Sequence, residues 1–345
     1  MAAIKTTIPK GSLILITGAT GFVASHVAKQ FLERGYRVRG TVRDLNKASW
    51  LVSDVFKVYA DQAAFELILV PDFTAENAFS EAVKGVAAIA HVAAATDFDP
   101  DPNNVIPQAV TATTSLMEAA LRESSILEFV YTSSIVTATM PVPGNSTRVE
   151  RHTWNDLALQ LAWAPPPYEP ERGPLVYMAS KVAAEKAVWE FSEQKKPRFA
   201  VNAICPPAIL GEPLDRTHVE VKAAYIKLLA EGKTEFLETM PATLAVNVKD
   251  VALLHVAAIL DPDVQNARIQ PWAQFCDWND MLTIMRKLLP QRKFIDDLPN
   301  LTELSLSTDT TQPLSLLKKW GNQDGWVSLE ETVKENLMPV VKWGY

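Results

Sequence analysis

Short apolar runs alternate with segments of helical periodicity between residues 12 and 204. Six runs have the length and composition of buried parallel strands, and they span residues 12–18, 36–42, 65–70, 86–93, 128–134 and 199–204. Helical spacing of apolar residues appears between them, at 22–35, 75–85, 110–123 and 177–194. Strands that alternate with helices are joined by right-handed crossovers. This part is therefore predicted to be an α/β fold with a doubly wound parallel sheet.

The alternation fades beyond residue 210. Helical patterns there span residues 219–232, 248–260, 278–290 and 313–321. We therefore expect a first domain, residues 1–210, and a smaller, mostly helical lobe, residues 211–345, of which residues 245–262 pack back on the first domain. The proline-rich stretch 163–174 is expected to be either a lid over the site or rigid surface structure.

Composition narrows the class of protein. The chain has 345 residues, of which 48% are hydrophobic and 21% charged, and its formal net charge is -7. It has no basic stripe, and its longest apolar run is too short to span a bilayer, so neither a nucleic acid nor a membrane is expected as a partner. Two cysteines cannot form a disulfide framework, and no spacing suggests a metal site. The first residues lack the apolar stretch of a secretory signal, so a cytoplasmic protein is expected. It is expected to be a monomer or a homodimer.

Two glycines separate the first predicted strand from the first predicted helix, in the stretch "ITGATGFVASH". Glycine permits a tight turn and a close approach of the backbone to a pyrophosphate, and the N-terminus of the following helix offers N–H groups. The residues expected to hold a dinucleotide here are Gly18, Thr20, Gly21, Phe22 and Val23. This strand–turn–helix context is that of a Rossmann-type fingerprint, and an ordinary βα turn is the alternative.

The end of the second predicted strand indicates which dinucleotide binds. NAD sites usually place a carboxylate there, whereas "VRGTVRD" places Arg43 there. A guanidinium matches a 2′-phosphate, so NADP is the expected cofactor, unless Arg43 only pairs with Asp44. Asp72 and Phe73 follow the third strand and are expected at the adenine, although Asp72 is equally compatible with a simple turn. Ala93, which ends the fourth strand, is also assigned to the cofactor site.

Tyr177 and Lys181 lie four residues apart in the helix predicted at 177–194, so they share one face. A nearby ammonium group is expected to lower the pKa of the phenol, and the pair can then exchange a proton with a carbonyl or alcohol oxygen. A partly buried tyrosine beside a solvated lysine is the alternative. The stretch "FVYTSS" supplies a hydroxyl for the same oxygen. Ser134 is preferred, with Ser133 and Thr132 as alternatives.

The chain resembles the extended short-chain dehydrogenase/reductase family over nearly its whole length. The resemblance is carried by "TGATGFVASHV", "FVYTSS", "VYMASKVAAEKAVWEF" and "VNAICPPAILG". Within that family, the chain is similar to fungal NADPH-dependent aldehyde and ketone reductases, including the yeast carbonyl and methylglyoxal reductases, and plant dihydroflavonol reductases are more distant relatives. The family's pattern implies a catalytic triad, a 2′-phosphate arginine and a proline beside the nicotinamide, which are Ser134, Tyr177 and Lys181, Arg43, and Pro206. Tyr177 and Lys181 would also contact the cofactor. The helix predicted at 110–123 lacks the asparagine that many members use in a proton relay.

The same resemblance implies a small-molecule carbonyl substrate held against the C-terminal lobe. The expected wall residues are Phe98, Tyr225, Met240 and Thr243, although for any one of them taken alone ordinary core packing is the favoured alternative. The expected activity is NADPH-dependent reduction of aldehydes or ketones to alcohols. The alternatives are an epimerase or dehydratase of a sugar nucleotide and a non-catalytic NADP-binding sensor.

Overall fold

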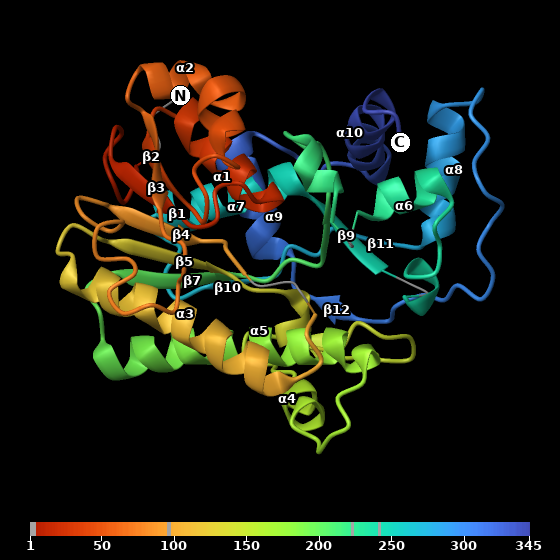
Figure 1. Cartoon of the computed structure of the whole chain (residues 1–345), viewed down its shortest axis with the longest axis horizontal. Coiled ribbons are helices and arrows are strands. Elements are labelled where there is room, and N and C mark those ends of the chain that lie inside the picture. Colours follow the sequence, from red (N-terminus) through yellow and green to blue (C-terminus); the bar gives the residue numbers. More distant parts are fainter. Residues whose placement is uncertain (1–4, 95–97, 222–223, 241–242) are drawn as a thin grey trace. The chain divides into compact units, whose positions relative to one another are not determined.

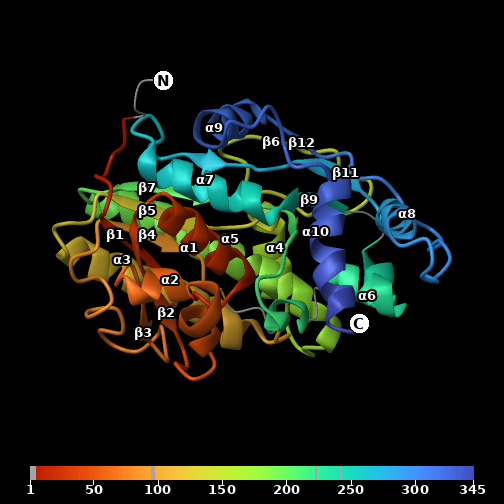
Figure 2. The same ribbon diagram turned by 90° about the horizontal axis from the view of Figure 1, so that it is seen from above.

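The computed structural model describes residues 5–94, 98–221, 224–240 and 243–345. The chain forms two compact units, shown in Figures 1 and 2. Unit 1 comprises Met1–Met140, Arg151–Cys205 and Ala252–Ile269. Unit 2 comprises Pro141–Glu150, Pro206–Val251 and Gln270–Tyr345. Each unit is therefore assembled from stretches that are separate in the sequence.

Unit 1 is built on a seven-stranded parallel sheet with the strand order β10-β7-β5-β4-β1-β2-β3. The strands are β1 (Leu13–Ile16), β2 (Arg37–Val42), β3 (Phe65–Leu69), β4 (Ala88–His91), β5 (Glu128–Thr132), β7 (Ala200–Ile204) and β10 (Arg268–Ile269). The strand order reverses between β1 and β4, which is where a doubly wound sheet binds ligands, at the carboxyl ends of its strands. The predicted α/β fold with a parallel sheet is confirmed.

Helices cover both faces of this sheet. α1 (Phe22–Glu33) and α7 (Val248–Leu260) lie on one face, and α3 (Pro102–Arg122) and α5 (Gly173–Lys195) lie on the other (Figures 1 and 2). The short helix α4 (Asp156–Ala162) packs on α5, and α2 (Lys57–Asp61) precedes β3. Because both faces are covered, β1, β4 and β5 are buried at every position, which explains their uninterrupted apolar runs.

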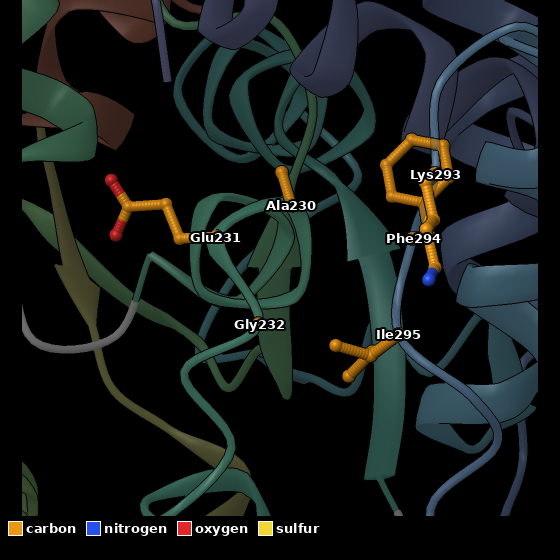
Figure 3. Close-up of a pocket in the computed structure, with 6 residues that line it drawn as sticks. All are labelled: Ala230, Glu231, Gly232, Lys293, Phe294 and Ile295. Carbon is orange, nitrogen blue, oxygen red and sulfur yellow. The ribbon is translucent and has the colours of Figure 1, made fainter.

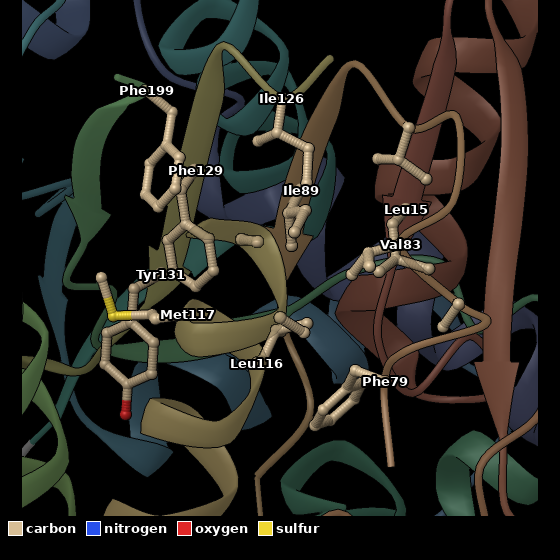
Figure 4. Close-up of a cluster of buried hydrophobic side chains, with 14 of the residues drawn as sticks. Leu15, Phe79, Val83, Ile89, Leu116, Met117, Ile126, Phe129, Tyr131 and Phe199 are labelled. Atoms are coloured by element: carbon tan, nitrogen blue, oxygen red, sulfur yellow. The ribbon is translucent and has the colours of Figure 1, made fainter. Parts of the chain in front are cut away.

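A cluster of buried apolar side chains joins the sheet to α3 (Figure 4). Leu15, Ile89 and Phe129 from three adjacent strands meet Leu116 and Met117 of the helix. None of these five side chains is exposed to solvent. Their burial supplies the hydrophobic free energy that holds β1, β4 and β5 against the helix layer.

The helix predicted at 110–123 begins earlier in the structure, at Pro102. Asp101 caps it by accepting a hydrogen bond from Asn103 N at 2.9 Å, and Pro102 takes the first helical position, where its missing N–H costs nothing. Pro107 lies inside the helix and is tolerated there. The additional turns extend the face that packs along α5.

Residues 75–85 do not form the predicted helix and instead form successive turns. Asn77 has a φ of 58°, and the N–H groups of Ala78 and Ser80 bond to carbonyls three residues back. A left-handed residue interrupts the i→i−4 bonds of an α-helix. Phe79 and Val83 are nevertheless buried. The helical spacing of apolar residues therefore reflects how these turns pack on the core.

Unit 2 contains two small sheets and, besides short 3-10 turns, four complete α-helices in its described part. The strand order β11-β9-β8 relates Gln274–Cys276, Thr243–Asn247 and Ala208–Leu210, and β12 (Ser307–Thr308) pairs with β6 (Arg148–Val149). The helices are α6 (Tyr225–Glu231), α8 (Trp278–Leu288), α9 (Thr311–Gly321) and α10 (Leu329–Lys342). The helix predicted at 219–232 is reduced to α6, while 222–223 lie outside the described residues. Trp278, Met281 and Leu337 are central to the core of this unit.

None of the helices in the described part of the chain combines the length and the apolar character that crossing a bilayer requires.

Candidate active site

The turn between β1 and α1 is shaped by glycine. Gly18 has a φ of 67°, and a Cβ there would lie 3.0 Å from the Cβ of Ala93. Gly21 N donates to Gly18 O at 2.8 Å and closes the turn. α1 begins at Phe22, directly after Gly21, a residue with no side chain to cap the helix. Thr20, Phe22 and Val23 thus lie at a helix N-terminus that an anionic group can approach.

A buried histidine holds the end of β4 next to this turn. Thr17 Oγ1 accepts hydrogen bonds from Val92 N and Ala93 N, both at 3.0 Å, and therefore donates its own hydrogen to His91 Nδ1 at 2.8 Å. The other ring nitrogen, Nε2, is 3.4 Å from Thr113 Oγ1. Burial lowers the pKa of His91 to about 3, so the ring is neutral at physiological pH. This network fixes Ala93 against Gly18.

The predicted nucleotide-selecting residues lie at the carboxyl ends of β2 and β3. Arg43 is exposed directly after β2, and the Asp44 carboxylate caps the next turn by accepting from Asn46 N at 2.8 Å. Asp72 is also exposed. Its hydrogen bonds to Thr74 lower its pKa, and the charge of Arg43 contributes a smaller effect in the same direction. The two charged groups are therefore near enough to interact.

Phe73 packs inward. Its ring lies 4.8 Å from the ring of Phe79, centroid to centroid, and it contributes to the core of unit 1. The side chain is only partly buried, and its assignment to the adenine stays a prediction.

The position of α5 depends on a close backbone contact at its first residue. A Cβ at Gly173 would lie 2.2 Å from the carbonyl oxygen of Phe98, so only glycine fits there. One turn along the helix, the ring of Tyr177 lies 5.3 Å from the ring of Phe98, and the Ser134 side chain lies close enough to the Tyr177 hydroxyl to influence its pKa. Tyr177 and Ser134 are both partly accessible, so a ligand can reach them.

The three hydroxyls that follow one another at the end of β5 have different partners. Thr132 Oγ1 hydrogen-bonds His255 Nε2 of α7 at 2.7 Å, and Ser133 Oγ donates to Glu185 Oε2 of α5 at 2.5 Å. Ser134 is the member of the three whose side chain acts on the pKa of Tyr177. The structure therefore brings Ser134, rather than the two alternatives, to the phenol.

Lys181 is buried beside these residues, with only 5% of its surface exposed. Its Nζ donates to Thr132 O at 2.8 Å and to Tyr131 Oη at 3.2 Å, and it lies 4.7 Å from the centre of the Tyr131 ring. An ammonium group has three donors, so a further bond to a ligand hydroxyl can be made. Burial lowers the pKa of Lys181 to about 8, and the charge of Glu185 opposes that shift.

The pKa of Tyr177 differs from the sequence expectation. Burial raises it, and the Ser134 side chain opposes the shift only in part. The protein alone therefore keeps the phenol protonated at neutral pH, whereas the spacing to Lys181 had suggested a lowered pKa. A protonated phenol is the form that can give a proton to a carbonyl oxygen.

The other predicted wall residues belong to unit 2. The ring of Tyr225 lies 5.2 Å from the ring of Trp278, and Met240 O accepts from Trp278 Nε1 at 2.7 Å. Thr243 opens β9 and pairs with Cys276 of β11. Pro206 is buried and follows β7 where the chain enters this unit.

A hollow of about 260 Å³ in unit 2 lies at the C-terminal end of α6 (Figure 3). Its lining residues are Ala230, Glu231, Gly232, Lys293, Phe294 and Ile295, and none of them is a predicted site residue. Across the described ranges, no cluster of three or more His, Cys, Asp or Glu side chains is arranged to hold a metal ion.

Sequence reasoning missed two residues that shape this site. Tyr131 contacts Lys181 through both its hydroxyl and its ring. Glu185 lies one helical turn beyond Lys181 and acts on its charge. The repeated spacing of four from Tyr177 to Lys181 to Glu185 is a signal that would have found the second.

Comparison with known proteins finds relatives along nearly the whole chain. A family model described as the NAD dependent epimerase/dehydratase family matches residues 14–270. The NAD-dependent epimerase/dehydratase terH of Aspergillus terreus (strain NIH 2624 / FGSC A1156) is 37% identical over 96% of this chain and 98% of its own. Aldehyde reductase 2 of Sporidiobolus salmonicolor is 35% identical over 96% of each chain. The crystal structure of Gre2 from Candida albicans in complex with NADPH has the same fold, with a TM-score of 0.80 and 24% identity over 97% of this chain and 100% of that chain.

Proposed function

Because the chain belongs to the NAD-dependent epimerase/dehydratase family, we propose that it reduces aldehydes or ketones to alcohols with NADPH. The observation that carries this proposal is the meeting of Tyr177, Ser134 and Lys181 at the end of β5. The glycine turn follows β1 at the same edge of the sheet, with β4 between the two strands. The relative named aldehyde reductase supports the reaction type.

The residues around the glycine turn fit a dinucleotide. Any side chain at Gly18 would meet Ala93 and would require a strained backbone, so glycine keeps this part of the cradle open. Gly18 and Gly21 would lie against the pyrophosphate, and the N-terminus of α1 would face its charge. Arg43 would hold the 2′-phosphate, which favours NADPH over NADH. The exposed Asp72 would accept from the adenine amino group.

The catalytic side chains have separate tasks. When bound, the reduced dinucleotide supplies the hydride that adds to the carbonyl carbon. Tyr177 gives its hydroxyl proton to the carbonyl oxygen, and Ser134 Oγ donates a second hydrogen bond that orients this oxygen. The Lys181 ammonium stabilises the phenolate that remains and offers its third donor to a ribose hydroxyl. Phe98, packed on the Tyr177 ring, forms an apolar wall beside the reacting oxygen.

A cofactor assay with several carbonyl compounds tests this proposal. Purified protein is mixed with NADPH and, separately, with aldehydes, ketoesters and diketones, and the loss of NADPH absorbance is followed. We expect substrate-dependent oxidation of NADPH and an alcohol product. Binding of NADPH without turnover of any compound would instead indicate a sensor. Conversion of a sugar nucleotide with no net loss of cofactor would indicate an epimerase.

A further inference from the structure

Glu185 is a fully buried carboxylate on the same face of α5 as Tyr177 and Lys181. Oε1 accepts from Arg268 Nε at 2.7 Å and from Trp189 Nε1 at 3.1 Å. Oε2 accepts from Ser133 Oγ at 2.5 Å and from Arg268 Nη2 at 3.3 Å. Burial pushes the pKa of Glu185 upward, but the Arg268 charge and these bonds outweigh it and hold the pKa below its usual value. The carboxylate is therefore ionised and held in one orientation.

Arg268, on β10, connects Glu185 by hydrogen bonds to several segments of unit 1. Its Nη1 donates to Thr153 O at 2.6 Å and to Arg151 O at 3.3 Å, and its Nη2 donates to Thr137 Oγ1 at 3.0 Å. The guanidinium also lies 4.1 Å from the centre of the Trp154 ring. The Glu185–Arg268 pair therefore links α5, β10, the end of β5 and the segment before α4.

Ser134 is connected to this pair on both sides. Its preceding neighbour, Ser133, donates to Glu185, and Thr137 donates to Ser134 O at 2.8 Å while it accepts from Arg268. The backbone of Ser134 is thus tied to the helix that carries Tyr177. A change in the ion pair would move the Ser134 hydroxyl relative to the phenol.

Glu185 is also the negatively charged group that acts on the pKa of Lys181. The titratable groups around Lys181 are Tyr131 of β5, His91 of β4, Cys205 after β7, Tyr177 and Glu185 of α5, Arg268 of β10 beyond Glu185, and His255 of α7, which bonds to Thr132. Of these, only Glu185 carries a negative charge at neutral pH, because burial raises the pKa of Cys205 to about 12 and raises those of both tyrosines. Removing its charge leaves the Lys181 ammonium without this favourable interaction.

Stability alone does not account for such a pair. Burying two charges costs desolvation free energy, and apolar residues of similar volume often stabilise a fold equally well. An ion pair adds geometric specificity that apolar packing lacks, because each charge-assisted hydrogen bond fixes the orientation of its partner. Here the directed bonds lead to the residues beside Ser134 and to the helix of Tyr177.

We propose that Glu185, paired with Arg268, is a positioning residue that aligns Ser134 with Tyr177 and supplies the counter-charge for Lys181. This inference rests on the proposed function, because it assigns a role within the same reaction. Glu185 acts through its neighbours and touches neither substrate nor cofactor.

The test compares Glu185→Gln with Glu190→Gln, a matched change at an exposed position of the same helix. Two readouts are followed against pH: NADPH affinity by fluorescence titration, and kcat for an aldehyde. In Glu185→Gln we expect the alkaline loss of NADPH affinity and of kcat to move to lower pH by roughly one unit, because the neutral form of Lys181 is favoured. We also expect kcat at neutral pH to fall by about tenfold or more, with KM changed less. Glu190→Gln should behave like the wild-type protein.

Two further variants separate this role from a purely structural one. Glu185→Asp keeps the charge but shortens the reach to Ser133, so it should lower kcat while it restores the pH dependence. The double variant Glu185→Gln/Arg268→Met avoids an unpaired buried guanidinium if Glu185→Gln alone fails to fold, and it should show the same direction of pH shift. Thermal unfolding establishes that each variant is folded.

The proposal is overturned if folded Glu185→Gln has the pH dependence and kcat of Glu190→Gln. It is also overturned if both Glu185→Gln and the double variant are unfolded, because the pair would then be a requirement of the fold. If the wild-type protein binds NADPH but reduces no carbonyl compound, the proposed function fails, while the pH dependence of NADPH binding still tests Glu185.

Discussion

Burial moves the pKa values of Tyr177 and Lys181 in opposite directions. The pKa of the Tyr177 phenol is raised above its ordinary value, so the phenol is protonated at neutral pH. The pKa of Lys181 is lowered to about 8, so its amine is charged at neutral pH but loses the charge at higher pH. Reduction of a carbonyl requires a protonated Tyr177 and a charged Lys181. Both conditions hold at pH values below the pKa of Lys181.

The pH dependence of reduction follows from these shifts. A lysine whose pKa is lowered keeps its charge below that pKa and loses it above. We expect kcat/KM for carbonyl reduction to decline by about tenfold per pH unit once the pH has risen through about 8. Steady-state rates measured across this range at constant ionic strength check the prediction. A profile that stays flat well above pH 8 would mean that the Lys181 charge is not needed.

We propose that Arg43 determines the choice between NADPH and NADH. Arg43→Ala removes a charge-assisted contact to the 2′-phosphate, so NADPH affinity should fall by about 10- to 100-fold, while NADH affinity changes little. Arg37→Ala is the matched control, because Arg37 is exposed at the opposite end of β2. Fluorescence titrations with both dinucleotides provide the measurement. Equal losses for NADPH and NADH would show that Arg43 does not contact the phosphate.

At the scale of elements, the cradle depends on the β1–α1 turn more than on any one side chain. Gly18 combines a left-handed φ with a close approach to Ala93, whereas Gly85 has a similar φ of 68° and no atom within 4 Å of an added Cβ. A side chain at either glycine would strain the backbone, but only a side chain at Gly18 would also collide with a neighbouring residue of the cradle.

Replacing each glycine by alanine tests this distinction. Gly18→Ala and Gly85→Ala should both destabilise the fold, by about 1 kcal/mol for the left-handed backbone. Only Gly18→Ala should also weaken NADPH binding, by about tenfold or more, because its Cβ displaces Ala93 or the turn. NADPH titrations and thermal unfolding of both variants check this. Unchanged NADPH affinity in folded Gly18→Ala would contradict the placement of the dinucleotide.

Most strands of unit 1 could be predicted because a parallel sheet covered on both faces requires continuous apolar runs. β10 escaped prediction because it has two residues, one of which is Arg268, and that arginine is buried only through its bonds to Glu185 and backbone carbonyls. A helix was wrongly predicted at residues 75–85, because their apolar spacing matches a helix while Asn77 has a left-handed backbone conformation. The predicted family is confirmed by the match over residues 14–270.

Local spacing also explains which parts of the candidate site the sequence reveals. Tyr177 and Lys181 are neighbours on one helix, and Ser134 ends an apolar strand, so each has a nearby signal. Arg268 lies 83 residues from Glu185, and Tyr131 lies 50 residues from Lys181. Contacts of that separation leave no periodic pattern and appear only in the folded chain.

At the scale of the molecule, β5 runs from the amino edge of the sheet in unit 1 to its carboxyl edge, where the candidate site lies. Its carboxyl end leads to Ser134, whereas its first residue, Glu128, lies at the amino edge of the sheet and is 1% exposed. Within the described part of the chain, Glu128 Oε2 has no hydrogen-bond partner, and burial raises the pKa of Glu128 to about 8.

This carboxyl makes stability depend on pH. Its folded pKa is raised, so the unfolded chain loses the proton first, and stability falls as pH rises from the ordinary glutamate range through about 8. Glu128→Gln removes this loss. Relative to the wild type, its Tm should be higher at pH 9 by roughly 5 °C and nearly equal at pH 4. Glu193→Gln, at an exposed position of α5, is the control. A Tm difference independent of pH would contradict the assignment.

The most direct test of the central claim removes one oxygen atom, by Tyr177→Phe. NADPH affinity and the turnover of the best aldehyde substrate are measured on the same preparation. If Tyr177 gives the proton, the variant binds NADPH within about twofold of the wild type while kcat falls by about 100- to 10,000-fold. A folded variant that keeps kcat within a factor of about two would contradict the account.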